Sequence, residues 1–126
     1  MRTILLVEDD PLQAFVRMSV LQKRFSNVRR VVDATEALCL IEQPQFSDNL
    51  GLIISGHQVP GMGGPAFVAE LRTRIPSVPV LVLGTGSETA SDYAAERVQF
   101  LARPIASEEL LSLAGRMMTK NGVKTA

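Results

Sequence analysis

This sequence of 126 residues has few of the side chains on which most catalytic and metal sites depend. It contains one cysteine, Cys39, and one histidine, His57. A single cysteine excludes a disulfide within the chain and a zinc site built from several cysteines, and it is consistent with a reducing cytosol. A Ser-His-Asp triad would have to use His57. Because no cluster of metal ligands accompanies that residue, we interpret it as an ordinary loop histidine.

Strong net charge and long apolar runs are also missing. Basic and acidic residues number 13 each, so the formal net charge is zero and nothing attracts the chain to nucleic acid or to an anionic membrane. The absence of tryptophan argues against a stacking platform for single-stranded nucleic acid. No apolar run approaches the roughly 18 residues of a membrane span. The first apolar run begins so early that we expect no signal peptide. We therefore predict a cytoplasmic location, with no nucleic acid or membrane as partner.

What is present is a regular alternation of short apolar runs with segments of helical periodicity. Runs typical of buried strands occupy residues 3–7, 28–32, 52–55, 79–83 and 98–102. Helices are predicted at 11–25, 34–42, 65–74 and 88–97, and after Ser107. This alternation predicts one α/β domain over residues 1–126, with a parallel sheet covered on both faces and a frayed tail at 119–126.

An acidic cluster separates the first strand from the first helix. Glu8, Asp9 and Asp10 follow the strand directly, and three neighbouring carboxylates need a cation or a solvated setting. Pro11 suits the first turn of the helix. Residues that share one face of this helix are Leu12, Phe15, Val16, Ser19 and Val20.

Local signals also place the second strand and the second helix. Arg29 and Arg30 interrupt the second apolar run, which indicates a partly solvated strand at the edge of the sheet. Asp33 and Glu36 have the spacing of a capping box and predict where the next helix begins.

The third apolar run stops at a sharp turn rich in proline and glycine, with the sequence LIISGHQVPGMGG at residues 52–64. In an open parallel sheet, ligands gather outside the carboxyl ends of the strands. Gly56 stands at such an end, where a functional side chain would be expected, and it has none.

This stretch resembles the third strand and following turn of the receiver domain of two-component response regulators, and the likeness extends over essentially the whole chain. The resemblance implies a flavodoxin-like (βα)5 fold, a doubly wound parallel sheet with strand order 2-1-3-4-5, and a role in a bacterial signalling system. In that family two acidic residues bind Mg²⁺ and an aspartate accepts a phosphoryl group. The hydroxyl of a serine or threonine bonds an oxygen of that group, and a lysine followed by a proline holds it from the other side. An aromatic residue three positions before the lysine acts as a switch. The matching positions here are Glu8 and Asp9, Gly56, Gly84, Arg103-Pro104 and Phe100.

The departures from the family pattern predict a degenerate receiver, or pseudo-receiver, that is not an enzyme. Glycine cannot form an acyl phosphate, and Gly84 offers no hydroxyl. We expect no cofactor, or at most residual Mg²⁺ at Glu8 and Asp9. One hypothesis is that Arg103 bridges these carboxylates across the emptied site. Alternatively, the acidic cluster is only a solvated strand end in which Asp10 caps the helix.

Two other functions stay open at this point. The chain could accept a phosphoryl group on an unconventional residue, Ser55, His57 or Thr85, with Mg²⁺ at the acidic pair. It could instead bind a small anion at Arg103, in the space that the two glycines leave.

The predicted partner is a signalling protein, either a kinase or an output protein. In the family, the surface for output and dimer contacts comprises the helix here at 88–97, the strand at 98–102 and the last helix. The last helix carries two apolar stripes, one of which must cover the sheet. We therefore expect a partner face around Phe100 and along Leu111 and Met118. The same face is a candidate for homodimer contacts.

Overall fold

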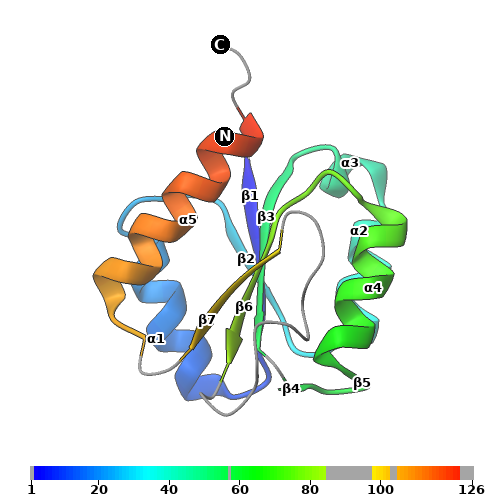
Figure 1. The fold of residues 1–126 in the computed structure, drawn as a ribbon, viewed down its shortest axis with the longest axis horizontal. Coiled ribbons are helices and arrows are strands. Elements are labelled where there is room, and N and C mark those ends of the chain that lie inside the picture. The colour runs from blue at the N-terminus through cyan, green and yellow to red at the C-terminus, as the bar shows by residue number, and fades with distance from the viewer. Residues whose placement is uncertain (1, 57, 85–97, 103–104, 123–126) are drawn as a thin grey trace.

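The computed structural model describes residues 2–56, 58–84, 98–102 and 105–122 of the chain (Figure 1). The main sheet contains the strands β1 (Thr3–Val7), β2 (Val28–Val31), β3 (Leu50–Gly56), β6 (Val80–Gly84) and β7 (Val98–Ala102). The helices are α1 (Pro11–Leu21), α2 (Ala34–Ile41), α3 (Pro44–Ser47), α4 (Gly64–Arg74) and α5 (Ser107–Gly122). A separate small hairpin joins β4 (Gln58–Val59) to β5 (Met62–Gly63). The helix predicted at 88–97 lies outside the described residues.

The main sheet is parallel, and its strands lie in the order β2-β1-β3-β6-β7. Since β6 and β7 are the fourth and fifth strands predicted from the sequence, the expected order 2-1-3-4-5 and the doubly wound α/β class are confirmed. The arginine-containing strand β2 lies at the edge, as expected. The order reverses between β1 and β3, which makes their carboxyl ends the switch point where such folds place their sites.

Helices cover both faces of this sheet. Figure 1 shows α1 and α5 on one face, and α2 and α4 on the other. The central strand β3 supplies side chains to both layers in alternation: Leu50 and Ile53 belong to the core cluster under α2 and α4, whereas Leu52 and Ile54 belong to the cluster under α1 and α5. All four are fully buried. A strand buried on both faces must be continuously apolar, which is why this run was recognisable in the sequence.

Side-chain caps determine where the first two helices begin. The Asp10 carboxylate accepts a hydrogen bond from the backbone N–H of Leu12 at 3.0 Å. The Asp33 carboxylate accepts from the N–H of Glu36 at 2.8 Å, and the Glu36 carboxylate in turn accepts from the N–H of Val32 at 2.9 Å. The first bond confirms Asp33 as the cap of this helix, and the second differs from a standard capping box only in reaching Val32, one residue before the cap.

The face of α1 that packs on the sheet is not the apolar face found in the sequence. Leu12, Phe15 and Val16 are 68%, 69% and 48% exposed. The buried residues of the helix are Ala14, Arg17, Val20 and Leu21. Leu21 and Phe25 determine this orientation, because both enter the core cluster under α5 and burying them turns residues 12, 15 and 16 outward.

α1 ends at Leu21, four residues before the predicted end. The backbone N–H of Lys23 donates to the carbonyl of Val20 at 3.2 Å, and that of Arg24 donates to the carbonyl of Leu21 at 3.1 Å. These bonds span three residues and tighten the chain into a turn. The turn carries Phe25 into the core, so the apolar side chain at this position serves tertiary packing and does not mean that the helix continues.

The segment after β3, expected as an irregular turn, forms the small antiparallel hairpin β4–β5. Val59 pairs with Met62, and Pro60 and Gly61 form the connection. Gly61 has a φ of 94°, in the left-handed region that favours glycine. Proline followed by a residue of positive φ is typical of a type II turn.

Replacing Gly61 with alanine should therefore lower the free energy of unfolding by about 1 kcal/mol, because a Cβ is strained at positive φ. The control is Gly63→Ala in the same hairpin. No atom lies within 4 Å of a Cβ built at Gly63, and its φ of −67° suits alanine. We expect the control to stay within about 0.5 kcal/mol of the native chain in urea unfolding. Equal losses for both variants would contradict the strained-turn interpretation.

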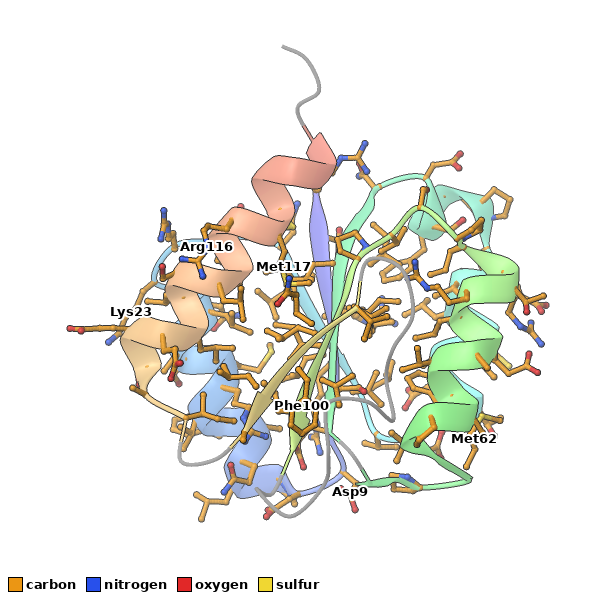
Figure 2. All side chains as sticks on the ribbon, in the orientation of Figure 1. Asp9, Lys23, Met62, Phe100, Arg116 and Met117 are labelled. Carbon is orange, nitrogen blue, oxygen red and sulfur yellow. The ribbon has the colours of Figure 1, made fainter. Side chains whose placement is uncertain are left out.

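α5 covers the sheet with one stripe and extends beyond its predicted end. Leu110, Ala114 and Met117 are buried against the sheet. Figure 2 shows Met117 on the inner side of α5 and Arg116 on its outer side. The helix reaches Gly122, so residues 119–122 are helical and the frayed tail predicted at 119–126 begins too early.

Candidate functional site

The strand ends bring the predicted site positions to one edge of the sheet, here called the carboxyl edge. Val7, the last residue of β1, pairs with Ser55 of β3, and Gly56 follows Ser55. On the other side, Gly56 pairs with Leu83, so Gly84 ends β6 beside it. The turn after β1 and the ends of β3 and β6 are therefore neighbours, at the bottom of the view in Figure 1.

The two glycines leave the middle of this edge without side chains. Gly56 is partly exposed and Gly84 is buried. Neither offers an oxygen beyond its backbone carbonyl, so no nucleophile and no hydroxyl is present at these positions. Arg103 and Pro104, which the sequence places at the same edge, lie outside the described residues, as does the predicted bridge from Arg103 to the carboxylates.

In the structure, Glu8 is paired with Arg17, which lies on the buried side of α1. Arg17 Nη1–H donates to Glu8 Oε1 at 2.7 Å. The second carboxylate oxygen of Glu8 accepts from the backbone N–H of Asp10 at 3.1 Å. The side chains of Arg17 and Glu8 are only 8% and 11% exposed, so this is a largely buried ion pair. Both carboxylate oxygens of Glu8 therefore have a donor from the protein itself.

A second arginine holds the backbone of the acidic turn, residues 8–10. Arg30 Nε–H donates to the carbonyl of Glu8 at 2.9 Å, and Arg30 Nη2–H donates to the carbonyl of Asp9 at 3.3 Å. The side chain of Asp9 points to solvent, at the lower end of β1 in Figure 2. Asp10 caps α1, as one of the sequence alternatives proposed.

Sequence reasoning missed both arginines, for different reasons. Arg30 was noticed only as an interruption of an edge strand, and its carbonyl partners lie in the acidic turn that follows the neighbouring strand, β1. Arg17 falls between apolar residues on a helix, where a charge is normally assigned to solvent. Only the spacing from Leu21 and Phe25, which lie four and eight residues later, could have indicated that Arg17 faces inward.

Among the described residues, the donors at this edge do not fit a divalent cation. Mg²⁺ takes about six oxygen ligands in octahedral geometry. Both oxygens of Glu8 are engaged, Gly56 contributes no side chain, and the carboxylate of Asp9 remains. Within the described part of the chain, no three His, Cys, Asp or Glu side chains come together as a metal group. In this arrangement the guanidinium of Arg17 supplies the positive charge that the buried carboxylate needs.

Of the three unconventional phosphoryl acceptors considered from the sequence, the structure describes only Ser55. Ser55 is 1% exposed, and its Oγ donates to the carbonyl of Gly56 at 3.1 Å. A reagent in solvent therefore cannot reach this hydroxyl without opening the strand end. His57 and Thr85 lie outside the described residues.

The side chains of the predicted partner face are only partly exposed to solvent. Phe100 on β7 is half-buried and packs against the cluster under α2 and α4, in the centre of Figure 2. Leu111 and Met118 on α5 are half-buried and pack against the other cluster. The most exposed large apolar side chains of the described residues lie instead on α1. No helix in the described ranges has the length and apolar character needed to cross a membrane.

Comparison with known proteins gives a consistent result. The family described as "Response regulator receiver domain" matches residues 4–114. A curated relative, "Sensor kinase CckA" of Brucella abortus (strain 2308), is 26% identical over 121 residues, which are 94% of this chain and 13% of that protein. The chain thus spans about one eighth of the length of this relative.

Among solved structures, the signal receiver domain of a signal transduction histidine kinase from Syntrophus aciditrophicus superposes with a TM-score of 0.81 at 26% identity. The match covers 100% of this chain and 95% of that one. A response regulator receiver domain protein from Clostridium thermocellum has a TM-score of 0.83 at 17% identity, covering 95% and 96% of the two chains, and shows the shared fold.

Proposed function

Because this chain belongs to the response regulator receiver domain family of two-component signalling, we propose that it is a pseudo-receiver. It acts through protein–protein contact, without taking up a phosphoryl group, and catalyses no reaction of its own. The partner is a kinase or an output protein of a bacterial pathway in the cytoplasm. The observation that carries the proposal is Gly56 at the carboxyl end of β3, where the family's acceptor aspartate would stand.

The positions of Gly56 and Gly84 at the carboxyl edge lack the side chains that phosphoryl transfer requires, and this supports the proposal. Transfer of a phosphoryl group requires an oxygen nucleophile in line with the donor and cations that neutralise the charge on the phosphoryl oxygens. Gly56 supplies no nucleophile, and Gly84 supplies no hydroxyl. Ser55, next along the strand, is buried and hydrogen-bonded.

The Arg17–Glu8 pair supports it further. A metal ion would have to displace a guanidinium that lies 2.7 Å from Glu8 Oε1 in a largely buried setting. Arg17 is part of the same chain and is always charged. The pair therefore keeps the acidic turn in one arrangement, as expected for a domain whose binding surface does not switch with phosphorylation.

The experiment is intact-mass measurement after incubation with acetyl phosphate and Mg²⁺. We expect no added mass on the native chain and little on Gly56→Asp. The double variant Gly56→Asp/Arg17→Met should gain one phosphoryl group, because it restores a carboxylate at Gly56 and removes the cation that occupies Glu8. In the same samples, about 10 mM Mg²⁺ should raise the melting temperature of the double variant and not that of the native chain.

Phosphorylation of the native chain would refute the proposal, and peptide mapping would then locate an unconventional acceptor such as His57 or Thr85. Binding of acetyl phosphate to the native chain without added mass, detected by calorimetry, would favour the small-anion sensor instead. Failure of the double variant to bind Mg²⁺ would leave the pseudo-receiver standing and contradict only the role assigned to Arg17.

A further inference from the structure

α1 presents its apolar side chains to solvent and buries its arginine. Leu12, Phe15 and Val16, here called the α1 patch, are 68%, 69% and 48% exposed, whereas Arg17 is 7% exposed. Single exposed apolar residues are ordinary, but three large ones on adjacent positions of one helix form a continuous patch that water disfavours. The core does not use this patch, since Ala14, Met18 and Leu21 face the protein in their place, with Met18 half-buried.

A hollow adjoins the patch. A cavity of about 220 Å³ opens between α1 and α5, and Val16 belongs to its wall together with Val20, Ile105 and Leu110. Phe15, which precedes Val16, projects from the surface beside it. Polar side chains, those of Gln13, Arg17 and Ser107, complete the wall of the cavity. The same surface therefore carries an exposed aromatic ring and a recess of mixed polar and apolar lining.

The two ends of α1 carry opposite charges. Asp9 and Asp10 are exposed at its amino-terminal end, and Lys23 is exposed just after its carboxyl-terminal end. Figure 2 shows Asp9 and Lys23 at these opposite ends. Between them the outward side of the helix has no charged residue. A complementary partner surface would have an apolar centre. It would place a basic group beside the amino-terminal end of α1 and an acidic group beside its carboxyl-terminal end.

A second copy of this chain has that pattern, and we propose that the α1 patch is the interface of a homodimer with antiparallel α1 helices. Val16 is the middle residue of α1, so a two-fold axis there brings the acidic turn before one helix toward Lys23, which follows the helix of the partner subunit. Phe15 lies one residue from the axis, beside the hollow of the partner subunit. Each contact occurs twice, as in any isologous interface. The proposal does not depend on whether the chain is phosphorylated.

The interface is small, so we expect a weak dimer with a dissociation constant on the order of 10 μM. Sedimentation equilibrium over about 5 to 500 μM covers this range. Phe15→Lys should weaken the dimer at least about tenfold, because it places a charge in the apolar centre. Val32→Lys is the matched control, since Val32 is also an exposed apolar residue, 41% exposed, and belongs to a different element, directly after β2.

A charge exchange tests the antiparallel arrangement. Lys23→Glu alone should weaken association, because it faces Asp9 of the partner subunit with a like charge. The double variant Asp9→Lys/Lys23→Glu should recover most of the native affinity, since both pairs are restored with reversed sign. Circular dichroism of each variant checks that the fold is intact.

Each remaining outcome contradicts the proposal. A native chain that stays monomeric up to about 500 μM overturns the homodimer and assigns the patch to a helix of another protein. A dimer that Phe15→Lys and Val32→Lys affect equally uses a different surface, such as the one around Phe100 and Leu111. A charge exchange that restores nothing excludes the antiparallel pairing.

Discussion

Replacing Glu8 with glutamine should lower the free energy of unfolding by about 2–3 kcal/mol, because it removes the negative charge that faces a buried guanidinium. Arg17 Nη1 lies 2.7 Å from Glu8 Oε1, and the two side chains are 8% and 11% exposed. The matched control is Glu70→Gln. Glu70 makes a 3.2 Å ion pair with Arg74 on α4, and these side chains are 46% and 33% exposed. We expect the control to cost about 0.5 kcal/mol or less, since solvent screens that pair.

Urea unfolding followed by circular dichroism measures these changes, as the chain has no tryptophan. A cycle that adds Arg17→Met and the double variant Glu8→Gln/Arg17→Met isolates the interaction between the two residues. The double variant should cost at least about 1 kcal/mol less than the sum of the single variants. Additive losses, or equal losses for Glu8→Gln and Glu70→Gln, would show that the pair contributes no more than a surface ion pair.

The second large effect concerns two phenylalanines with opposite surroundings. Phe67→Ala should lower the free energy of unfolding by about 4 kcal/mol, because Phe67 on α4 is fully buried in the core cluster under α2 and α4 and its loss leaves a cavity. That is a large fraction of the stability of a domain of this size. Phe15→Ala makes the same chemical change at a side chain that is 69% exposed, and it should cost about 0.5 kcal/mol or less.

Both variants are compared by urea unfolding at one low protein concentration, so that association through α1 does not contribute. A loss at Phe15 as large as that at Phe67 would mean that Phe15 packs inside the monomer, which would contradict both the orientation of α1 and the proposed dimer. A loss confined to Phe67 is the result expected for a helix whose apolar patch is free for a partner.

The orientation of α1 connects the two proposals. Because Leu21 and Phe25 are drawn into the core, the helix turns Arg17 toward the end of β1 and turns the α1 patch toward solvent. The same rotation thus fills the acidic turn with an internal cation and creates a surface that can bind a partner. A rotation by one residue, about 100°, would undo both features at once.

The sequence by itself determined where most strands and helices lie. β1 and β7 begin and end at the predicted residues. β1 was visible because a strand buried on both faces is continuously apolar, whereas β7 is a partly exposed strand at the edge of the sheet. The starts of α1 and α2 were also predictable, since Asp10 and the Asp33–Glu36 box act on neighbouring backbone groups. The edge position of β2 followed from its arginines. The positions of Glu8, Gly56 and Gly84 at one edge followed from the parallel order of the strands.

Only the tertiary structure decided what surrounds Glu8. Helical periodicity identifies the faces of α1, but it does not say which face meets the sheet when an apolar stripe competes with a second one that includes Leu21. The choice depends on contacts with α5 and β1, which are distant in the sequence. The contacts of Arg17 with Glu8 and of Arg30 with the backbone of the acidic turn follow from that packing and from the register of β1 and β2. A local pattern carries no information about such contacts, because the two partners meet only after the sheet and its helices have assembled.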